Sequence, residues 1–186
     1  TGLPKAVMQS HGGLLSESAG TSRMNRFSAA EVSLNWMPLD HVGGIVMFHV
    51  RDVFLGCQQI HAVTELILQE PLRWLDLIAR FRATLTWAPN FAFALVNARE
   101  EAIRERHWDL SSMRFILNGG EAIVARTARR FLQMLRPHGL PGTCMHPAWG
   151  MSETSSGVTY SDSFSVETTS DDDSFVEVGA PIPGFS

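Results

Sequence analysis

Residues 146–154 read His146-Pro147-Ala148-Trp149-Gly150-Met151-Ser152-Glu153-Thr154 and bring an aromatic ring, a glycine, a hydroxyl and a carboxylate within five positions. These groups suit a nucleotide: Trp149 offers a flat face to a base, and Gly150 lets the backbone approach a ligand. Ser152 can bond a phosphate or acyl oxygen, and Glu153 can hold a divalent cation. The alternative interpretation is a turn at a strand end with a solvated glutamate. Other stretches of the chain decide between a nucleotide site and a structural turn.

The length, composition and net charge exclude several classes of protein. The chain has 186 residues, of which 45% are hydrophobic, enough for one large domain or part of a larger protein. A net charge of −4 argues against a sequence-independent nucleic-acid binder. No apolar run reaches the ~18 residues of a membrane span, and the first residues given lack the charged-then-apolar layout of a signal peptide. We therefore expect a soluble, cytoplasmic protein with no nucleic-acid partner and no membrane span.

Strand and helix patterns alternate along the chain. Between residues 1 and 160 this alternation predicts an α/β core, with a largely parallel sheet and helices on both faces. Residues 161–175 are rich in Ser and Asp and predict a flexible loop. Strands are expected at 6–10, 32–36, 57–62, 83–87, 113–117 and 156–160, and helices at 12–24, 43–55, 71–81, 91–99 and 122–135.

Three further segments come at the ends or starts of these elements. Residues 1–5, Thr1-Gly2-Leu3-Pro4-Lys5, carry a hydroxyl, a glycine and a lysine that can grip phosphate, although a surface turn is the competing interpretation. His41 follows a strand and precedes a helix opened by paired glycines, and Gly119-Gly120 ends another strand. Because parallel strands end at one edge of a sheet, we expect Lys5, His41, Gly119-Gly120 and Trp149 near one rim.

Taken together, these segments resemble the adenylate-forming superfamily of acyl-CoA synthetases, fatty-acyl-AMP ligases and synthase adenylation domains. Residues 1–5 look like the end of its phosphate loop, and Pro38-Leu39-Asp40-His41-Val42-Gly43-Gly44 looks like its Pro-Leu-x-His segment. Asn118-Gly119-Gly120-Glu121 and residues 147–153 look most like the versions found in fatty-acyl-AMP ligases. Residues 178–184, Val-Gly-x-Pro-x-Pro-Gly, are similar to the connector toward the β-barrel subdomain, so 176–186 are expected to be that connector.

The resemblance implies ATP and Mg²⁺ as cofactors and assigns a role to each matching residue. Thr1, Gly2 and Lys5 would hold the β- and γ-phosphates, and the implied catalytic residues are Lys5, His41 and Glu153. Trp149 would stack on adenine in place of the usual Tyr, flanked by Gly150 and Met151, and Ser152 would contact phosphate. Glu153 would ligate Mg²⁺. The residues implied to border adenine or the acyl group are Asn118, Gly119, Gly120, Glu121, His41, Val42 and Gly43, with His41 between the acyl carboxylate and the α-phosphate.

Val42 bears on the substrate. The Pro-Leu-x-His segment of the family has an aromatic residue at the position of His41. In family members that activate amino acids, the next residue is typically an Asp that pairs with the α-ammonium of the substrate, whereas here it is the apolar Val42. A buried ammonium without a partner is costly, so we predict a non-amino carboxylic acid: fatty, aryl, hydroxy or keto. Asp40 would restore the amino-acid interpretation if the register were shifted.

The predicted function is therefore formation of an acyl-AMP and transfer of the acyl group to a thiol. The acceptor is expected to be the phosphopantetheine of an acyl carrier protein in polyketide or peptide biosynthesis, with coenzyme A and a free-standing acyl-CoA ligase as the alternative. A non-catalytic scaffold segment and an unrelated α/β domain remain open. The matching motifs cover the middle of the family's N-terminal domain, so we expect a piece of a longer polypeptide, inactive without its other subdomains.

Overall fold

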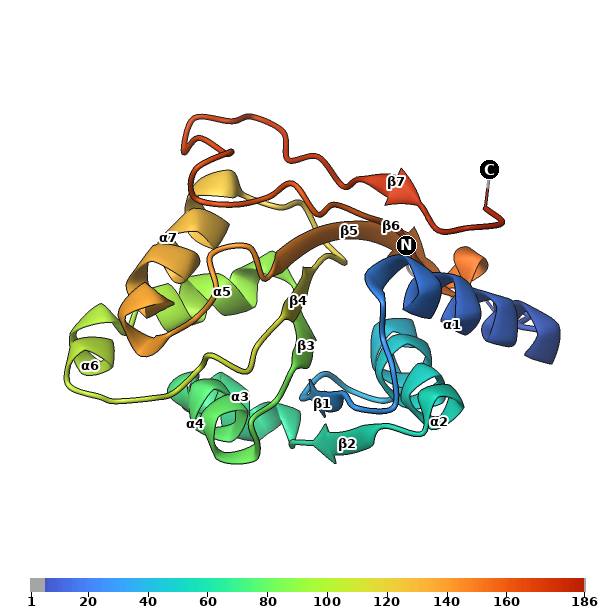
Figure 1. The fold of residues 1–186 in the computed structure, drawn as a ribbon, viewed down its shortest axis with the longest axis horizontal. Coiled ribbons are helices and arrows are strands. Elements are labelled where there is room, and N and C mark those ends of the chain that lie inside the picture. The colour runs from blue at the N-terminus through green and yellow to red at the C-terminus, as the bar shows by residue number, and fades with distance from the viewer. Residues whose placement is uncertain (1–5, 186) are drawn as a thin grey trace.

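The protein's structure is a computed structural model that describes residues 6–185, and its centre is one seven-stranded sheet (Figure 1). The strand order is β2-β1-β3-β4-β5-β6-β7. The strands are β1 (Val32–Asn35), β2 (Gln58–His61), β3 (Leu85–Ala88), β4 (Phe115–Asn118), β5 (Met145–Met151), β6 (Ser156–Tyr160) and β7 (Ala180–Pro181).

The sheet is parallel from β2 to β5 and antiparallel beyond. In β3 and β4, Leu85 is opposite Phe115 and Ala88 is opposite Asn118, so the two strands end level with each other. The predicted α/β class with a largely parallel sheet is confirmed. Parallel strands that end together place their following loops at one edge, where open sheets of this kind bind ligands.

Helices cover both faces of the sheet, as predicted (Figure 1). One face carries α3 (Thr64–Gln69), α4 (Leu72–Phe81), α5 (Asn90–Asn97), α6 (Glu100–Arg104) and α7 (Ala125–Leu135). The other face carries α1 (His11–Asn25), a π-helical segment η1 (Gly43–Val50) and its continuation α2 (Arg51–Leu55). The short 3₁₀ turns are η2 (Arg136–His138) and η3 (Ser152–Thr154). Among the described residues, no helix combines the length and the apolar character that crossing a membrane requires.

Each face of the sheet has its own apolar core. Alternate residues of a strand point to opposite faces, so Ile116 joins the core under α4, α5 and α7, while Phe115 and Leu117 join the core under η1. In the larger core, Trp74 packs against Phe93 and Phe131. The smaller core lies on the η1 face and reaches the sheet edge described below.

The predicted strand at residues 6–10 is wrong, because this segment is irregular and ends by capping α1. Ser10 has extended backbone angles, and its hydroxyl accepts a hydrogen bond from the Gly13 N–H at 3.0 Å. The sequence interpretation also missed α3 and the π-helical geometry of η1. Residues 161–175 contain no helix or strand, and Phe164 in this segment is buried in the larger core.

Candidate functional site

A pocket opens on the η1 face of the sheet, where β3 and β4 end. It is bounded by the segment that leads into η1, by the Gly119-Gly120 turn and by the end of β5. The residues that line it are His41, Val42, Gly43, Met47, Trp87, Leu117, Gly119, Gly120, Ala148, Trp149, Gly150, Met151, Ser156 and Gly157. Segments that lie more than 100 residues apart therefore form one pocket, as the sequence predicted for this rim.

The start of η1 packs directly against Trp87. A Cβ atom on Gly43 would lie 2.5 Å from Cη2 of the Trp87 ring, so only glycine fits without a shift of the indole. The His41 ring stacks on Trp87 with 5.9 Å between ring centroids, and His41 Nδ1 accepts a hydrogen bond from the Gly43 N–H at 3.1 Å. His41 is exposed and lines the pocket, and this bond leaves its Nε2 atom free of the Gly43 contact.

Trp149 lies where β5 changes partners. The strand pairs in parallel with β4 up to Pro147 and antiparallel with β6 from Ala148, and the register shifts between Trp149 and Gly150. Such irregularities redirect side chains and are common beside active sites. A Cβ on Gly150 would lie 1.9 Å from the Ser156 carbonyl oxygen, so this close pairing requires glycine. The Trp149 side chain remains 48% exposed, with its ring accessible to a ligand.

A second pocket adjoins the first across Trp149 and Gly150. Its volume is about 520 Å³, within the range of small-molecule sites, whereas the volume of the first pocket is about 60 Å³. Glu121 lines it, and one carboxylate oxygen of Glu121 accepts a hydrogen bond from the Phe91 N–H at the start of α5, at 2.6 Å. The other lining residues are Gly120, Ala122, Ile123, Ala148, Ser174, Phe175, Val176 and Val178. The two pockets thus meet at the residues to which adenine stacking was assigned.

Ser152 and Glu153 form the turn η3 after β5. The Thr154 hydroxyl accepts from the Met151 N–H at 3.1 Å and donates to the Ser156 carbonyl, so the turn is held at both ends. Gln9 adds a clamp, because its amide donates to the Ser152 carbonyl and accepts from the Ser155 hydroxyl. The segment that follows residues 1–5 is therefore bound to this turn.

Glu153 is exposed, lines a groove beside α1, and has no ion-pair partner within residues 6–185. No group of three or more metal-ligating side chains occurs in the part of the chain that the structure describes. Mg²⁺ bound with a nucleotide uses one or two carboxylates together with phosphate oxygens and water. A single available carboxylate fits that requirement, so Glu153 is suited to hold Mg²⁺ only in the company of a phosphate ligand.

Charge is scarce in the first pocket. Its described lining contains no carboxylate, and His41 is its one titratable side chain. Asp40 is exposed and does not line it, whereas Val42 does. His146, from the opening motif, is half-buried and stacks on Phe115, with 4.3 Å between ring centroids. Burial lowers the pKa of His146, and we assign it a structural role.

The remaining predicted residues lie elsewhere. Asn118 is fully buried in β4, where its amide donates toward the Met145 sulfur, and it does not line either pocket. Thr1, Gly2 and Lys5 fall outside the described residues. Roles for these residues stay predictions.

Several lining residues were not predicted from the sequence. Trp87 and Leu117 are the next-to-last residues of β3 and β4. Their place at the carboxyl end of a parallel strand is the sequence feature that could have predicted that they line a ligand site. Met47 follows Gly43 by four residues, which is the spacing of neighbours on one helical face. Ala148 lies inside the motif, and Gly157 comes from β6.

Comparison with known proteins gives a consistent picture. The family model described as AMP-binding enzyme matches residues 1–186. A nonribosomal peptide synthetase, btyA of Aspergillus terreus, is 37% identical over 188 residues, which cover 99% of this chain and 20% of btyA. The chain thus spans about a fifth of the length of the curated relatives it matches.

Solved structures agree in fold. The adenylation domain of a keto acid-selecting NRPS module, bound to a keto acyl adenylate, has a TM-score of 0.94 and 45% identity, covering 99% of this chain and 38% of that one. McyG A-PCP complexed with phenylalanyl-adenylate has a TM-score of 0.96 and 46% identity, covering 99% and 29%. Fatty acyl-adenylate ligase from L. pneumophila has a TM-score of 0.81 and 29% identity, covering 84% and 28%. The synthetase modules therefore share more of this sequence than that fatty acyl ligase does.

Proposed function

The chain belongs to the AMP-binding enzyme family, and from this premise we propose that it activates a carboxylic acid with ATP. A carboxylate oxygen of the acid attacks the α-phosphorus, a new O–P bond forms, and the bond to pyrophosphate breaks. The products are an acyl-AMP and pyrophosphate. The observation that carries this proposal is the pair of adjoining pockets that meet at Trp149 and Gly150.

The two pockets divide the acyl-AMP between them. We assign the acyl group to the pocket of Trp87, which is mostly apolar, and adenine to the pocket of Glu121, with the Trp149 ring against the base. His41 lines the acyl pocket, and Glu153 is in the turn after β5. The α-phosphate then belongs between His41 and η3.

Catalysis in this reaction consists mainly of positioning and of offsetting negative charge, because an anionic acid meets an anionic phosphate. The His41 imidazole and the Lys5 ammonium are the proposed donors to the phosphates. Mg²⁺ held by Glu153 would offset charge on the phosphate oxygens when it is bound. Ser152 is proposed to donate its hydroxyl to phosphate.

We propose that the acid carries no α-ammonium. The described lining of the acyl pocket offers no carboxylate to pair with an ammonium, and Val42 stands at the position that would supply one. A 2-keto acid is our first candidate, because its carbonyl is uncharged and a keto acid-selecting module is 45% identical. Identity alone does not choose the substrate, since a structure with phenylalanyl-adenylate is 46% identical. The choice rests on the lining.

The thiol acceptor is proposed to be a carrier protein of the same polypeptide, because relatives are peptide synthetases and one solved structure is an A-PCP pair. A cytoplasmic location is part of this proposal.

The test is acid-dependent ATP–pyrophosphate exchange by the full-length protein against fatty, aryl, 2-hydroxy, 2-keto and 2-amino acids. We expect the strongest exchange with a non-amino acid and its loss in Glu153→Ala. Strongest exchange with a 2-amino acid would overturn the substrate assignment. Binding of ATP without exchange for any acid would instead support a non-catalytic scaffold.

A further inference from the structure

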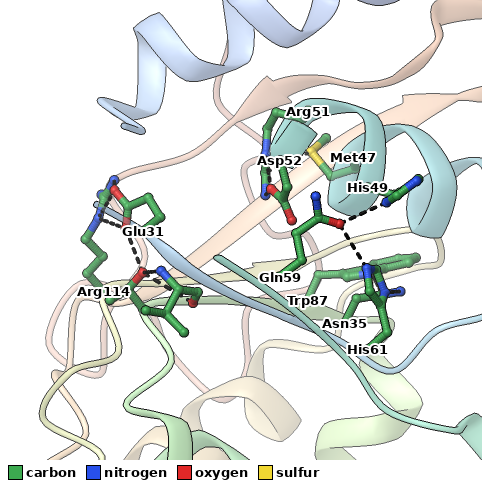
Figure 2. A network of polar contacts seen from close by, with 12 residues as sticks. Glu31, Asn35, Met47, His49, Arg51, Asp52, Gln59, His61, Trp87 and Arg114 are labelled. Carbon is green, nitrogen blue, oxygen red and sulfur yellow. Dashed lines mark hydrogen bonds and ion pairs between the residues drawn. The ribbon is translucent and has the colours of Figure 1, made fainter. Parts of the chain in front are cut away.

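The Trp87 indole has a polar anchor on the side away from the pocket. Trp87 Nε1 donates to Asn35 Oδ1 at 2.9 Å, and the two residues are 4% and 2% exposed. Trp87 comes from β3 and Asn35 from β1, which lie next to each other in the sheet. The bond therefore joins a pocket wall to the strand behind it (Figure 2).

Stacking alone does not fix the indole. Phe48 and His41 stack near the ring, with interplanar angles of 19° and 29° and centroids 5.9 Å away in each case. Stacked faces tolerate sliding of a ring and small rotations about its side-chain bonds. A hydrogen bond at Nε1 is directional and opposes those displacements. It therefore adds a constraint on the position of the Trp87 ring that stacking does not supply.

The orientation of the Asn35 amide is determined by its neighbours. Its oxygen accepts from two N–H groups, that of Trp87 and that of the Met37 backbone at 3.1 Å. Its nitrogen donates to the Met37 carbonyl at 2.9 Å. A flipped amide would place N–H against N–H twice, so the amide has one acceptable orientation.

The same amide nitrogen faces a polar chain that leads to the surface. His61 Nδ1 lies 3.4 Å from Asn35 Nδ2, a long contact that requires Nδ1 to be unprotonated. His61 Nε2 and His49 Nδ1 both contact Gln59 Oε1, at 3.0 and 2.9 Å (Figure 2). His49 and His61 are exposed, so this side of Asn35 is close to solvent.

We propose that Asn35 is a positioning residue of the acyl pocket, which acts by holding the Trp87 indole in the orientation that shapes the pocket wall. This inference rests on the proposed function for its effect on the acid substrate. Asn35 does not line the pocket and touches no substrate. Its loss leaves the Trp87 N–H buried without an acceptor, and the ring is then expected to rotate or shift.

The test is a double-mutant cycle in the full-length protein, with Asn35→Leu and Trp87→Phe made singly and together. In pyrophosphate exchange, Asn35→Leu is expected to raise KM for the acid about tenfold or more, with kcat and KM for ATP changed much less. In the Trp87→Phe background, which has no indole N–H, the same substitution is expected to have little further effect. An equal rise in both backgrounds would overturn the proposal.

A control variant guards against a general loss of stability. Asn97→Leu removes a comparably buried Asn, whose amide donates to the Thr127 carbonyl far from the acyl pocket, and should leave KM for the acid unchanged. The proposal fails if Asn97→Leu raises KM for the acid as much as Asn35→Leu does.

A spectroscopic measurement separates this inference from the proposed function. In protein labelled with 5-fluorotryptophan, the ¹⁹F signal that disappears in Trp87→Phe belongs to Trp87. We expect that signal to move in Asn35→Leu and to stay in place in Asn97→Leu. A signal unmoved by Asn35→Leu would refute the positioning role. Absence of exchange by the wild-type protein for every acid, with the signal moved, would refute the enzymatic function alone.

Discussion

Gly43 contacts the Trp87 ring so closely that a Cβ atom on it would lie 2.5 Å from Cη2 of the indole. Gly43→Ala must therefore displace Trp87 or η1, and overpacking of this kind costs about 1–3 kcal/mol. We expect KM for the acid to rise about tenfold, with KM for ATP nearly unchanged, in the exchange assay. Gly142→Ala is the control, because a Cβ there meets no atom within 4 Å. Equal behaviour of the two variants would contradict the close packing.

Val42 lines the acyl pocket, whose described lining has no carboxylate. Val42→Asp supplies an anion that can pair with the α-ammonium of a 2-amino acid, which a 2-keto acid lacks, so preference should shift toward amino acids. We expect the ratio of kcat/KM for a 2-amino acid to that for the matching 2-keto acid to rise about tenfold or more. Val42→Asn introduces a side chain of the same shape as Asp without its charge, and should shift this ratio much less. A ratio unchanged by Asp would show that Val42 does not face the α-substituent.

Trp149 leaves 48% of its side chain exposed at the junction of the two pockets. Base stacking on an aromatic side chain is worth about 1–3 kcal/mol when removed by alanine. Trp149→Ala should therefore raise KM for ATP about 5- to 100-fold, and Trp149→Tyr should remain within about threefold of wild type because a ring is kept. Initial rates at varied ATP would measure both. If Tyr were as defective as Ala, stacking would not be the role of Trp149.

Glu153 lies in the turn that Gln9 and Thr154 hold in place, and its carboxylate forms no ion pair with any residue from 6 to 185. Glu153→Gln keeps the size of the side chain and removes its charge, so a Mg²⁺ ligand is weakened while the turn is kept. We expect exchange to fall at least about 100-fold at low Mg²⁺ and to recover in part at high Mg²⁺. Titration of exchange rate with MgCl₂ gives the comparison. A loss that no Mg²⁺ concentration relieves would assign Glu153 another role.

The sequence predicted helices well where burial follows a period. In α4, Leu72, Leu75 and Ile78 recur at helical spacing, and all three are buried. The strand expected at residues 6–10 failed because a local competitor was overlooked: the Ser10 hydroxyl caps α1 and ends any extended pairing. A strand pattern and a helix cap can fall on the same few residues, and at residues 6–10 the structure has the cap and no strand.

His41 and Trp149, which both line the first pocket, were predicted from motifs with distinctive chemistry, and their roles stay predictions. Trp87 was missed because an indole at a strand end has the same sequence signature whether it faces a core or a pocket. Asn35 lies 52 positions from its partner Trp87, and only the pairing of β1 with β3 brings them together. Contacts set by strand register are not visible to periodicity or spacing.

We predict that Glu17 makes the stability of the protein depend on pH. It is 4% exposed in α1, and burial raises the pKa of its carboxyl to about 7, against the opposing effects of the hydrogen bond from the Thr21 hydroxyl and of the Arg51 charge. The folded state thus holds a proton that the unfolded state releases near pH 4.5. The resulting stability is fully present below about pH 4.5 and is lost as the pH rises through about 7, a difference of about 3 kcal/mol.

Glu17→Gln imitates the protonated carboxyl at every pH and can still accept from Thr21. At pH 8 the variant should have a free energy of unfolding up to about 3 kcal/mol higher than wild type, and therefore a higher unfolding temperature. Both differences should shrink as the pH is lowered toward 4.5. Glu70→Gln, at an exposed position, should show no such pH trend. Thermal unfolding of all three proteins between pH 4.5 and 8 measures this. A Glu17→Gln variant that is less stable than wild type at pH 8 would mean that the carboxylate is ionised in the fold and held by Arg51.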